Sequence, residues 1–478
     1  MFVSMIFPLF LGMTMALFFV LPAKWRPSIL LLTSYLFCAW IDVWALIVLV
    51  MVSFCTWMAG NRIEKFKGAE RKSEGKVYTT VVICFYIALL CIYKYLPHLL
   101  THLGVRQQLP ENLLRVLVMP AGLSFYLFQA IGYVADVYKG KCKAEKNFWH
   151  FSCYLAFFPK LVSGPIEREQ DFLPQIMNLG KATIKDRGRL STAFTYMLWG
   201  YFMKMVVADR LAVTVNRIFY DPSAFDSFWL ILGVFFYTIQ IYCDFAGYSY
   251  IAIGCARIFR VNLTQNFKAP YFAGSITDFW RRWHVSLSEW LRDYIYIPLG
   301  GNRNGFARKC INTMVVFLIC GMWHGVGLHF IAWGFLHGFY LIIEAAGRRK
   351  GWKIAGGRMI TFVAVSFAWI FFKADSLTAA VFYIAKMLTA GIQPHNWQQM
   401  AELLQLNMVE ITLIVIGIVV IGMVDGLCNR RKLHLPVLIQ YKQNAVRYLV
   451  FYLLIIAIFI FGIYGPGYHA ERFIYMQF

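Results

Sequence analysis

The feature that most constrains this chain is a succession of long apolar stretches. A helix that crosses the hydrocarbon core of a bilayer needs about 20 apolar residues. Candidate stretches run along the whole sequence, at 5–21, 29–58, 77–96, 113–134, 148–163, 192–217, 228–256, 311–345, 359–372, 408–427 and 446–465. We therefore predict an all-α polytopic membrane protein with roughly 10–12 helices, some of them tilted or broken.

The composition supports a membrane protein and excludes a set of soluble domains. Of 478 residues, 60% are hydrophobic and 15% are charged, whereas soluble domains have roughly 45–50% apolar and about 25% charged residues. The mean hydropathy is +0.58. The net charge is +22, but no soluble basic domain is present to carry it. We therefore predict the lipid bilayer as a partner and expect no nucleic acid.

Lys and Arg residues gather in short segments between the apolar stretches. The positive-inside rule places such segments on the cytoplasmic face of a membrane, and we assign to that face residues 61–76, 139–146, 181–189, 348–353 and 430–432. The sequence contains no repeat and no Ser/Gly-rich linker. We therefore predict one membrane domain over residues 1–478.

Three apolar stretches have lengths or compositions that do not fit a single straight crossing. Asp42 interrupts 29–58, which we expect to form two helices. The stretch 148–163 contains Pro159 and resembles a re-entrant segment. The stretch 311–345 is long enough for one kinked helix or for two helices.

Residues 262–309 form a segment that is both polar and aromatic. When residues 276–296 are placed on a helix, their apolar side chains fall on one side. We therefore predict an amphipathic helix that lies in the membrane plane, with Ser275 or Thr277 as its N-cap. Its apolar stripe comprises Phe279, Trp283, Leu287, Trp290 and Leu291. The opposite side of the helix carries Arg281, Ser288 and Arg292. A simple interfacial anchor remains an alternative, although an anchor has no need of His284, Glu289 or Asp293.

His324 lies in an apolar stretch and is flanked by Gly321 and Gly325, which leave room for a backbone or a ligand. An ionisable side chain inside a membrane is by default a candidate functional residue. The alternative is a structural His that a backbone carbonyl satisfies, and for His329 and His337 we favour that alternative. No metal site is predicted, because the spacing of His324 and His329 places them on different sides of a helix.

General-base catalysis is the chemistry that suits one buried His. A neutral imidazole can accept the proton of a hydroxyl group, which then attacks a thioester. The sequence contains no GxSxG or Walker A motif, and no GxGxxG that follows a strand. Hydrolase, ATPase and dinucleotide-binding functions therefore have no support.

Several ordered motifs stand out, namely 278–284 (Asp-Phe-Trp-Arg-Arg-Trp-His), 290–303 (beginning Trp-Leu-Arg-Asp-Tyr-Ile-Tyr), 322–325 (Met-Trp-His-Gly), 120–126, 157–168, 207–211, 240–249 and 371–375. These motifs resemble the membrane-bound O-acyltransferase (MBOAT) family, in particular its bacterial branch of alginate and polysaccharide O-acetylation. The resemblance extends from about residue 6 to the C-terminus. One departure is Tyr250, where a small polar or acidic residue is expected.

The resemblance implies a funnel of tilted helices around a central catalytic site. It implies that His324 is the membrane-embedded catalytic His and His284 the second characteristic His. Arg281 and Arg282 are equally well interpreted as phosphate ligands and as interface charges. The residues expected to bind the donor or support the site are Asp278, Trp280, Arg281, Arg282, Trp283, Arg292, Asp293, Asn302 and Trp323.

The C-terminal residues 473–478 follow an F-x-Y-x-x-F pattern centred on Tyr475. The pattern resembles a terminal tyrosine motif associated with acyl relay in bacterial systems of this kind. His324 would then supply the base that activates the phenol, since a free phenol has a pKa of about 10. The alternative is an aromatic anchor at the membrane interface.

The sequence therefore predicts an O-acyltransferase in a bacterial inner membrane. It would move an acetyl group from a cytoplasmic thioester, either acetyl-CoA or an acyl carrier protein, with no permanently bound cofactor. The acceptor would be an exported polysaccharide or cell-wall glycan, reached through an extracytoplasmic transferase of the SGNH type. One alternative is D-alanyl transfer toward teichoic acids. Another is a non-enzymatic transporter, flippase or scaffold, although transporters more often show internal repeats.

Overall fold

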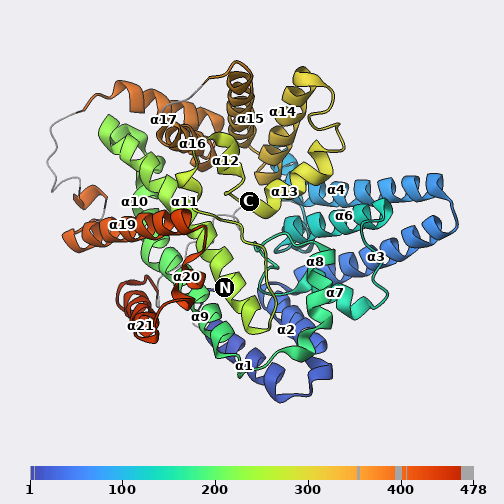
Figure 1. Cartoon of the computed structure of the whole chain (residues 1–478). Coiled ribbons are helices and arrows are strands. Elements are labelled where there is room, and N and C mark those ends of the chain that lie inside the picture. The colour runs from blue at the N-terminus through green and yellow to red at the C-terminus, as the bar shows by residue number, and fades with distance from the viewer. Residues whose placement is uncertain (1, 5, 353–355, 393–400, 405, 465–478) are drawn as a thin grey trace. The chain divides into compact units, whose positions relative to one another are not determined.

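The computed structural model describes residues 2–4, 6–352, 356–392, 401–404 and 406–464, without the side chains of residues 112 and 113. Every regular element of this part of the chain is helical (Figure 1), which confirms the predicted all-α class. The residues cluster into two compact units. Unit 1 comprises Met1–Ala193 and Ala252–Thr264, and unit 2 comprises Phe194–Ile251 and Gln265–Phe478.

The helices follow one another with short connections. Those up to residue 181 are α1 (Ile6–Val20), η1 (Ala23–Trp25), α2 (Arg26–Ile41), α3 (Val43–Gly68), α4 (Lys72–His102), η2 (Arg106–Gln108), α5 (Glu111–Val116), α6 (Leu123–Lys139), α7 (Phe148–Ala156), α8 (Glu169–Met177) and η3 (Leu179–Lys181). The helices that follow are α9 (Arg187–Tyr201), η4 (Phe202–Ala208), α10 (Asp209–Tyr220), η5 (Pro222–Ala224), α11 (Ser227–Ile258), η6 (Pro270–Phe272), α12 (Ile276–Trp280), α13 (Val285–Leu291), η7 (Arg292–Tyr296), α14 (Gly305–His324), α15 (Leu328–Arg349), α16 (Gly357–Lys373), α17 (Leu377–Thr389), α19 (Met408–Arg431), α20 (Leu435–Gln440) and α21 (Asn444–Phe461).

Seven of the described helices are long and apolar enough to cross a membrane, namely α3, α4, α11, α14, α15, α19 and α21. The helices α1 and α17 are apolar but shorter. The helix α17 lies outside every predicted stretch, because its 13 residues fall well short of the length of a crossing. The chain is therefore a multi-pass membrane protein.

The interruptions predicted from the sequence appear as helix boundaries. The carboxylate of Asp42 accepts hydrogen bonds of 3.1 Å from the backbone N–H groups of Trp44 and Ala45 and thereby begins α3. The stretch 311–345 is two helices, α14 and α15. In 148–163 only the nine residues of α7 are helical, too few to cross a membrane, and Pro159 lies in the turns that follow.

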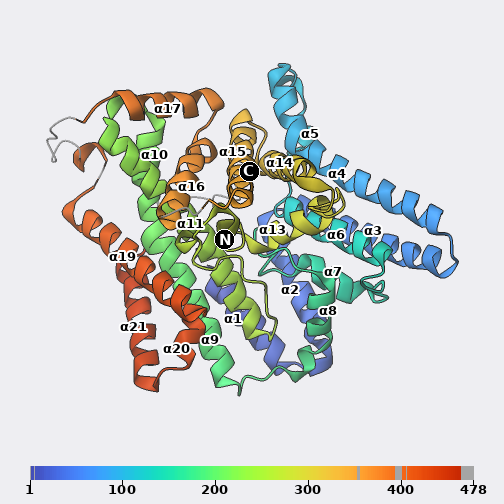
Figure 2. The same cartoon turned by 45° about the horizontal axis from the view of Figure 1, so that its top comes forward.

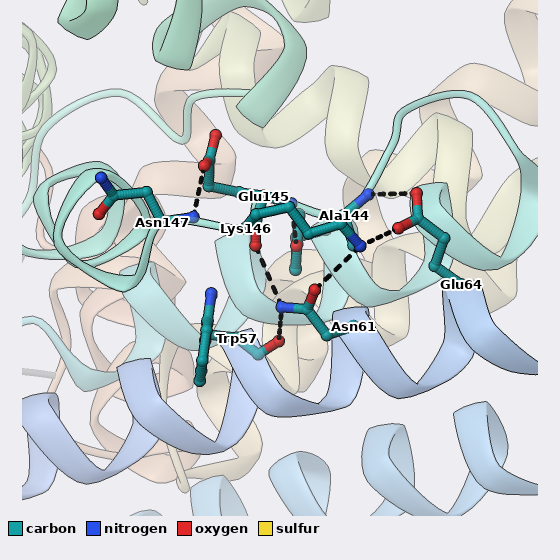
Figure 3. A network of polar contacts seen from close by, with 8 residues as sticks. Trp57, Asn61, Glu64, Ala144, Glu145, Lys146 and Asn147 are labelled. Carbon is teal, nitrogen blue, oxygen red and sulfur yellow. Dashed lines mark hydrogen bonds and ion pairs between the residues drawn. The ribbon is translucent and has the colours of Figure 1, made fainter.

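In unit 1, side chains near the end of α3 hold the segment that leads into α7 (Figure 3). Asn61 donates to the backbone carbonyl of Glu145 at 3.1 Å, and Glu64 accepts from the backbone N–H of Ala144 at 3.1 Å. Lys146 pairs with Glu64 and also donates to Asn61. The contacts bring the predicted basic segments 61–76 and 139–146 together, as expected if both lie on one face of the membrane.

In unit 2, a buried lysine joins three helical segments. Lys204 lies in the π-helical η4 and pairs with Asp209 of α10 at 2.8 Å and with Asp244 of α11. All three side chains are buried. Because loss of the ammonium group would leave two carboxylates buried without their cation, the cluster ties η4, α10 and α11 to one another.

The helices α14 and α15 form an antiparallel pair whose backbones approach closely, and they lie side by side in both views (Figures 1 and 2). A Cβ atom on Gly321 would overlap the carbonyl oxygen of Phe330, and one on Gly334 would overlap that of Phe317. Glycine therefore permits this distance between the two helices. The pair determines where the last residue of α14, His324, is placed.

We expect Gly334→Ala to lower the free energy of unfolding by about 1–3 kcal/mol, because the added methyl group meets a backbone atom that cannot move aside. The measurement is the thermal unfolding midpoint of the purified protein in detergent. Gly338→Ala is the matched control, since its Cβ would lie 3.0 Å from the flexible Sδ of Met314. Equal destabilisation by the two variants would contradict the close-approach explanation.

Candidate active site

The polar segment of unit 2 forms two short helices and not the predicted single helix over 276–296. The helix α12 ends at Trp280 and α13 begins at Val285. Between them His284 adopts a left-handed conformation, with φ +43° and ψ 54°, which no residue inside an α-helix can have. The hydroxyl group of Ser275 accepts from the backbone N–H of Asp278 at 3.2 Å, so the predicted N-cap is confirmed for the shorter helix.

The prediction of an interfacial helix is also wrong in its packing. The five side chains of its apolar stripe are all buried, as are Trp280 and His284. Trp283 is enclosed by the rings of Phe279, Phe267 and Trp369, at centroid distances of 5.0 to 5.5 Å. Periodicity alone cannot distinguish an apolar face that meets lipid from one that meets protein, and here the face meets protein.

Asn266 holds the turn that carries His284. It is fully buried. Its side-chain oxygen accepts from the backbone N–H of Ser286 at 3.1 Å, and its backbone carbonyl accepts from Val285 at 3.1 Å. One residue thus satisfies two N–H groups at the start of α13, which would otherwise be buried without partners.

His284 is a buried imidazole whose ring meets the edge of Phe245 at a centroid distance of 4.7 Å. Burial lowers the pKa of His284 to about 3, because the apolar surroundings disfavour the charged form. The side chain is therefore neutral at physiological pH. A neutral imidazole can donate through one nitrogen atom and accept through the other.

His324 is the last residue of α14 and is also buried. Its ring contacts Trp333 of α15 at 5.0 Å and Phe372 of α16 at 5.2 Å between centroids. The space left by Gly325 is taken by the ring of Phe330. A side chain therefore fills this space, and not the expected backbone or ligand; the expected backbone approach occurs at Gly321, which faces the carbonyl oxygen of Phe330.

Trp323 brings the two predicted catalytic histidines together. The centroid of its ring lies 4.8 Å from that of His324 and 6.3 Å from that of His284. The histidines are 40 positions apart in the sequence and come from different elements. Their convergence on one indole is the central geometric feature of this region.

His337 makes a structural contact, but its partner is an indole and not the backbone carbonyl that we expected. The indole N–H of Trp280 donates to Nδ1 of His337 at 3.2 Å, and the imidazole ring stacks against Phe279. Trp280 therefore joins α12 to α15. His329 is buried beside Phe330.

A basic pocket of about 330 Å³ is lined by residues that precede His284 and by residues at the end of α19 and beyond it. Arg282 on its wall is held by Asp278 at 2.9 Å and by Asn429 at 2.6 Å, whereas Arg281 is exposed and has no hydrogen-bond or ion-pair partner among the described residues. The guanidinium of Arg282 is thus bound by other side chains of the protein, whereas that of Arg281 is available to a ligand. The lining residues are Tyr250, Lys268, Ala269, Asp278, Arg281, Arg282, Asp425, Cys428, Asn429, Lys432, Leu433 and His434.

The remaining predicted site residues lie further from the histidines along the chain. Arg292 is exposed in η7 and donates to Asp293 at 2.8 Å. Asn302 is exposed in the turn before α14. Tyr475 lies outside the described residues, and its relay role stays a prediction.

Sequence reasoning did not assign roles to Asn266, Tyr250 or Asp425. Tyr250, which departs from the family pattern, lines the basic pocket together with Asp425. The signal for Asp425 was available, because it is a buried carboxylate within the apolar stretch 408–427. The role of Asn266 depends on contacts with residues 19 and 20 positions further on, which periodicity does not indicate.

Known proteins are similar to this chain. A family model for the membrane-bound O-acyltransferase family matches residues 145–349, which include both histidines. The chain is 34% identical over 426 residues to the probable alginate O-acetylase of Pseudomonas putida, covering 86% of this chain and 82% of that protein. It is 32% identical over 325 residues to the peptidoglycan O-acetyltransferase of Helicobacter pylori, covering 62% and 61%. It is 26% identical over 320 residues to the teichoic acid D-alanyltransferase of Bacillus subtilis, covering 62% and 75%.

We expect His284→Asn to fold better than His284→Val. Asparagine tolerates the left-handed conformation, whereas an ordinary L-residue pays roughly 1–2 kcal/mol for it and a β-branched residue is the least suited. The thermal unfolding midpoint in detergent should fall further for the valine variant. Equal midpoints would show that the backbone of residue 284 is not constrained in this way.

Proposed function

Because the chain belongs to the membrane-bound O-acyltransferase family, we propose that this O-acyltransferase moves an acyl group, most simply acetyl, from a cytoplasmic thioester across the membrane. The acyl group is passed toward a hydroxyl group of an exported polysaccharide or cell-wall glycan. The observation that carries the proposal is the convergence of two buried histidines on Trp323. This convergence lies inside the segment that the family model matches.

In the proposed step, His324 takes the proton of the attacking hydroxyl group. The hydroxyl oxygen forms a bond to the thioester carbonyl carbon, the carbon–sulfur bond breaks, and the thiolate leaves and recovers the proton from the imidazolium. The neutral His284 is suited to orient the carbonyl or the hydroxyl group through a hydrogen bond, because burial keeps its pKa near 3. Burial of both rings excludes water, which would otherwise hydrolyse the thioester.

The donor is proposed to be acetyl-CoA or an acyl carrier protein, both of which carry phosphate on their thioester arm. Arg281, Lys268 and Lys432 line the basic pocket and are exposed. Cations that no carboxylate holds are suited to bind phosphate. Arg281 is therefore the better candidate for a donor ligand, and Arg282 is better explained as a residue that positions the turn.

Similarity favours acetylation of a polysaccharide over D-alanylation of teichoic acid. The alginate O-acetylase match covers 86% of the chain at 34% identity, whereas the D-alanyltransferase match covers 62% at 26%. The proposed location is a bacterial inner membrane, and the proposed partner is an extracytoplasmic SGNH-type transferase. Tyr475 remains a proposed relay between the two enzymes.

We expect His324→Ala to abolish O-acetylation of the exported glycan while leaving the amount of exported polymer unchanged, because the variant lacks the general base. The measurement is ester content per polymer mass in cells that express each variant at equal level. His329→Ala is the control, since His329 lies on α15 and is assigned a packing role. Loss of polymer export with His324→Ala would instead support a transport function.

We expect Arg281→Gln/Lys432→Gln to raise the KM for the thioester donor by about tenfold for each cation–phosphate interaction that the variant removes, with little change in kcat. The assay measures thiol release by the purified protein. Arg308→Gln/Arg431→Gln removes the same charge from two exposed positions and serves as the control. A fall in kcat without a change in KM would contradict a donor-binding role.

A further inference from the structure

A second groove lies on the surface of α19, beside the start of α16 and the short helix η6. It has a volume of about 470 Å³, and η6 contacts both α16 and α19. None of the roles proposed above accounts for it. Its lining residues are Phe272, Arg358, Gly422, Met423, Gly426, Leu427, Asn429 and Arg430.

One end of the groove has an uncompensated positive charge. Arg358 and Arg430 are both exposed, and neither guanidinium has a hydrogen-bond or ion-pair partner among the described residues. Arg358 lies in the first turn of α16, where the helix dipole is also positive and disfavours a cation. Gly356, which precedes α16, has no side chain to cap the free N–H groups. The two guanidinium groups and the start of the helix therefore favour the binding of an anion.

The lining of the groove toward Gly422 is apolar. A Cβ atom on Gly422 would meet nothing within 4 Å, and one on Gly426 would lie 3.5 Å from the ring of Phe272. Met423 and Leu427 are 57% and 55% exposed. At a rise of 1.5 Å per residue, Gly422 lies about 12 Å along the helix from Arg430. If the two arginines lie at headgroup depth, the apolar end lies within the hydrocarbon core.

We propose that this groove binds one anionic phospholipid, with its phosphate between Arg358 and Arg430 and an acyl chain along Gly422 and Gly426. The positive charge of the two arginines favours an anionic lipid over a zwitterionic one. The apolar part of the groove favours a lipid over a soluble phosphate. The basic segments 348–353 and 430–432 assign the site to the cytoplasmic leaflet. Asn429 also lines the basic pocket and accepts a hydrogen bond from Arg282, so the lipid site adjoins the proposed donor pocket.

Native mass spectrometry of the full-length protein, with added phosphatidylglycerol or phosphatidylcholine of matched chains, tests the proposal. The wild type should retain one phosphatidylglycerol in preference to phosphatidylcholine. Arg358→Gln/Arg430→Gln should weaken retention by about tenfold for each guanidinium removed. Gly422→Leu keeps both charges, fills the groove and suits a helix, and it should weaken retention as well. Because the measurement is binding, it is independent of acyl transfer.

Arg308→Gln/Arg431→Gln is the matched control and should retain the lipid as the wild type does. The proposal is overturned if this control loses the lipid equally, or if Gly422→Leu binds like the wild type. It is also overturned if glycerol phosphate displaces the lipid as readily as phosphatidylglycerol does, which would indicate a soluble anion. A wild-type dimer that the groove variants dissociate would identify a second copy as the occupant. Thermal unfolding midpoints should confirm that every variant is folded.

Discussion

The close approach of α14 and α15 is the constraint on which the arrangement around His324 depends. Two helices whose facing positions are glycine can bring their backbones into contact, and here Gly321 and Gly334 face backbone carbonyl groups of the opposite helix. In an apolar solvent, where no hydrophobic force drives helices together, such close packing supplies much of the association energy. The pair fixes the end of α14, so that His324 contacts Trp333 from the partner helix.

The second constraint is the cost of burying polar groups in an apolar protein, which several contacts offset. Asn266 satisfies the backbone at the start of α13, the indole of Trp280 bonds His337, and Lys204 is shared by two carboxylates. Each arrangement joins segments that are distant in sequence. An unpaired polar group would cost about 1–3 kcal/mol or more, so these contacts restrict the fold to one arrangement. The left-handed turn at His284 is held in the same way.

The basic pocket and the groove on α19 meet at Asn429, and this connection has a functional consequence. A donor bound near Arg281 and a lipid bound near Arg430 would share one wall. The lipid would then influence the position of Arg282, because Asn429 holds that side chain. Acyl transfer in such a protein would depend on the composition of the membrane as well as on the concentration of the donor.

The sequence by itself determined the class of the protein and marked His324 as a candidate site residue. Apolar stretches near the length of a bilayer crossing leave no soluble alternative, and a histidine in such a stretch is costly enough to mark a site. The break between two helices at Asp42 was recognisable from the sequence, because a carboxylate that begins a helix bonds the backbone N–H groups of the next few residues. The tertiary structure decided that residues 276–296 turn at His284, that their aromatic stripe faces protein, and that Arg281 is available while Arg282 is held. Those outcomes depend on Asn266, Asn429 and Trp369, which contact segments distant in the sequence, and local periodicity carries no information about such contacts.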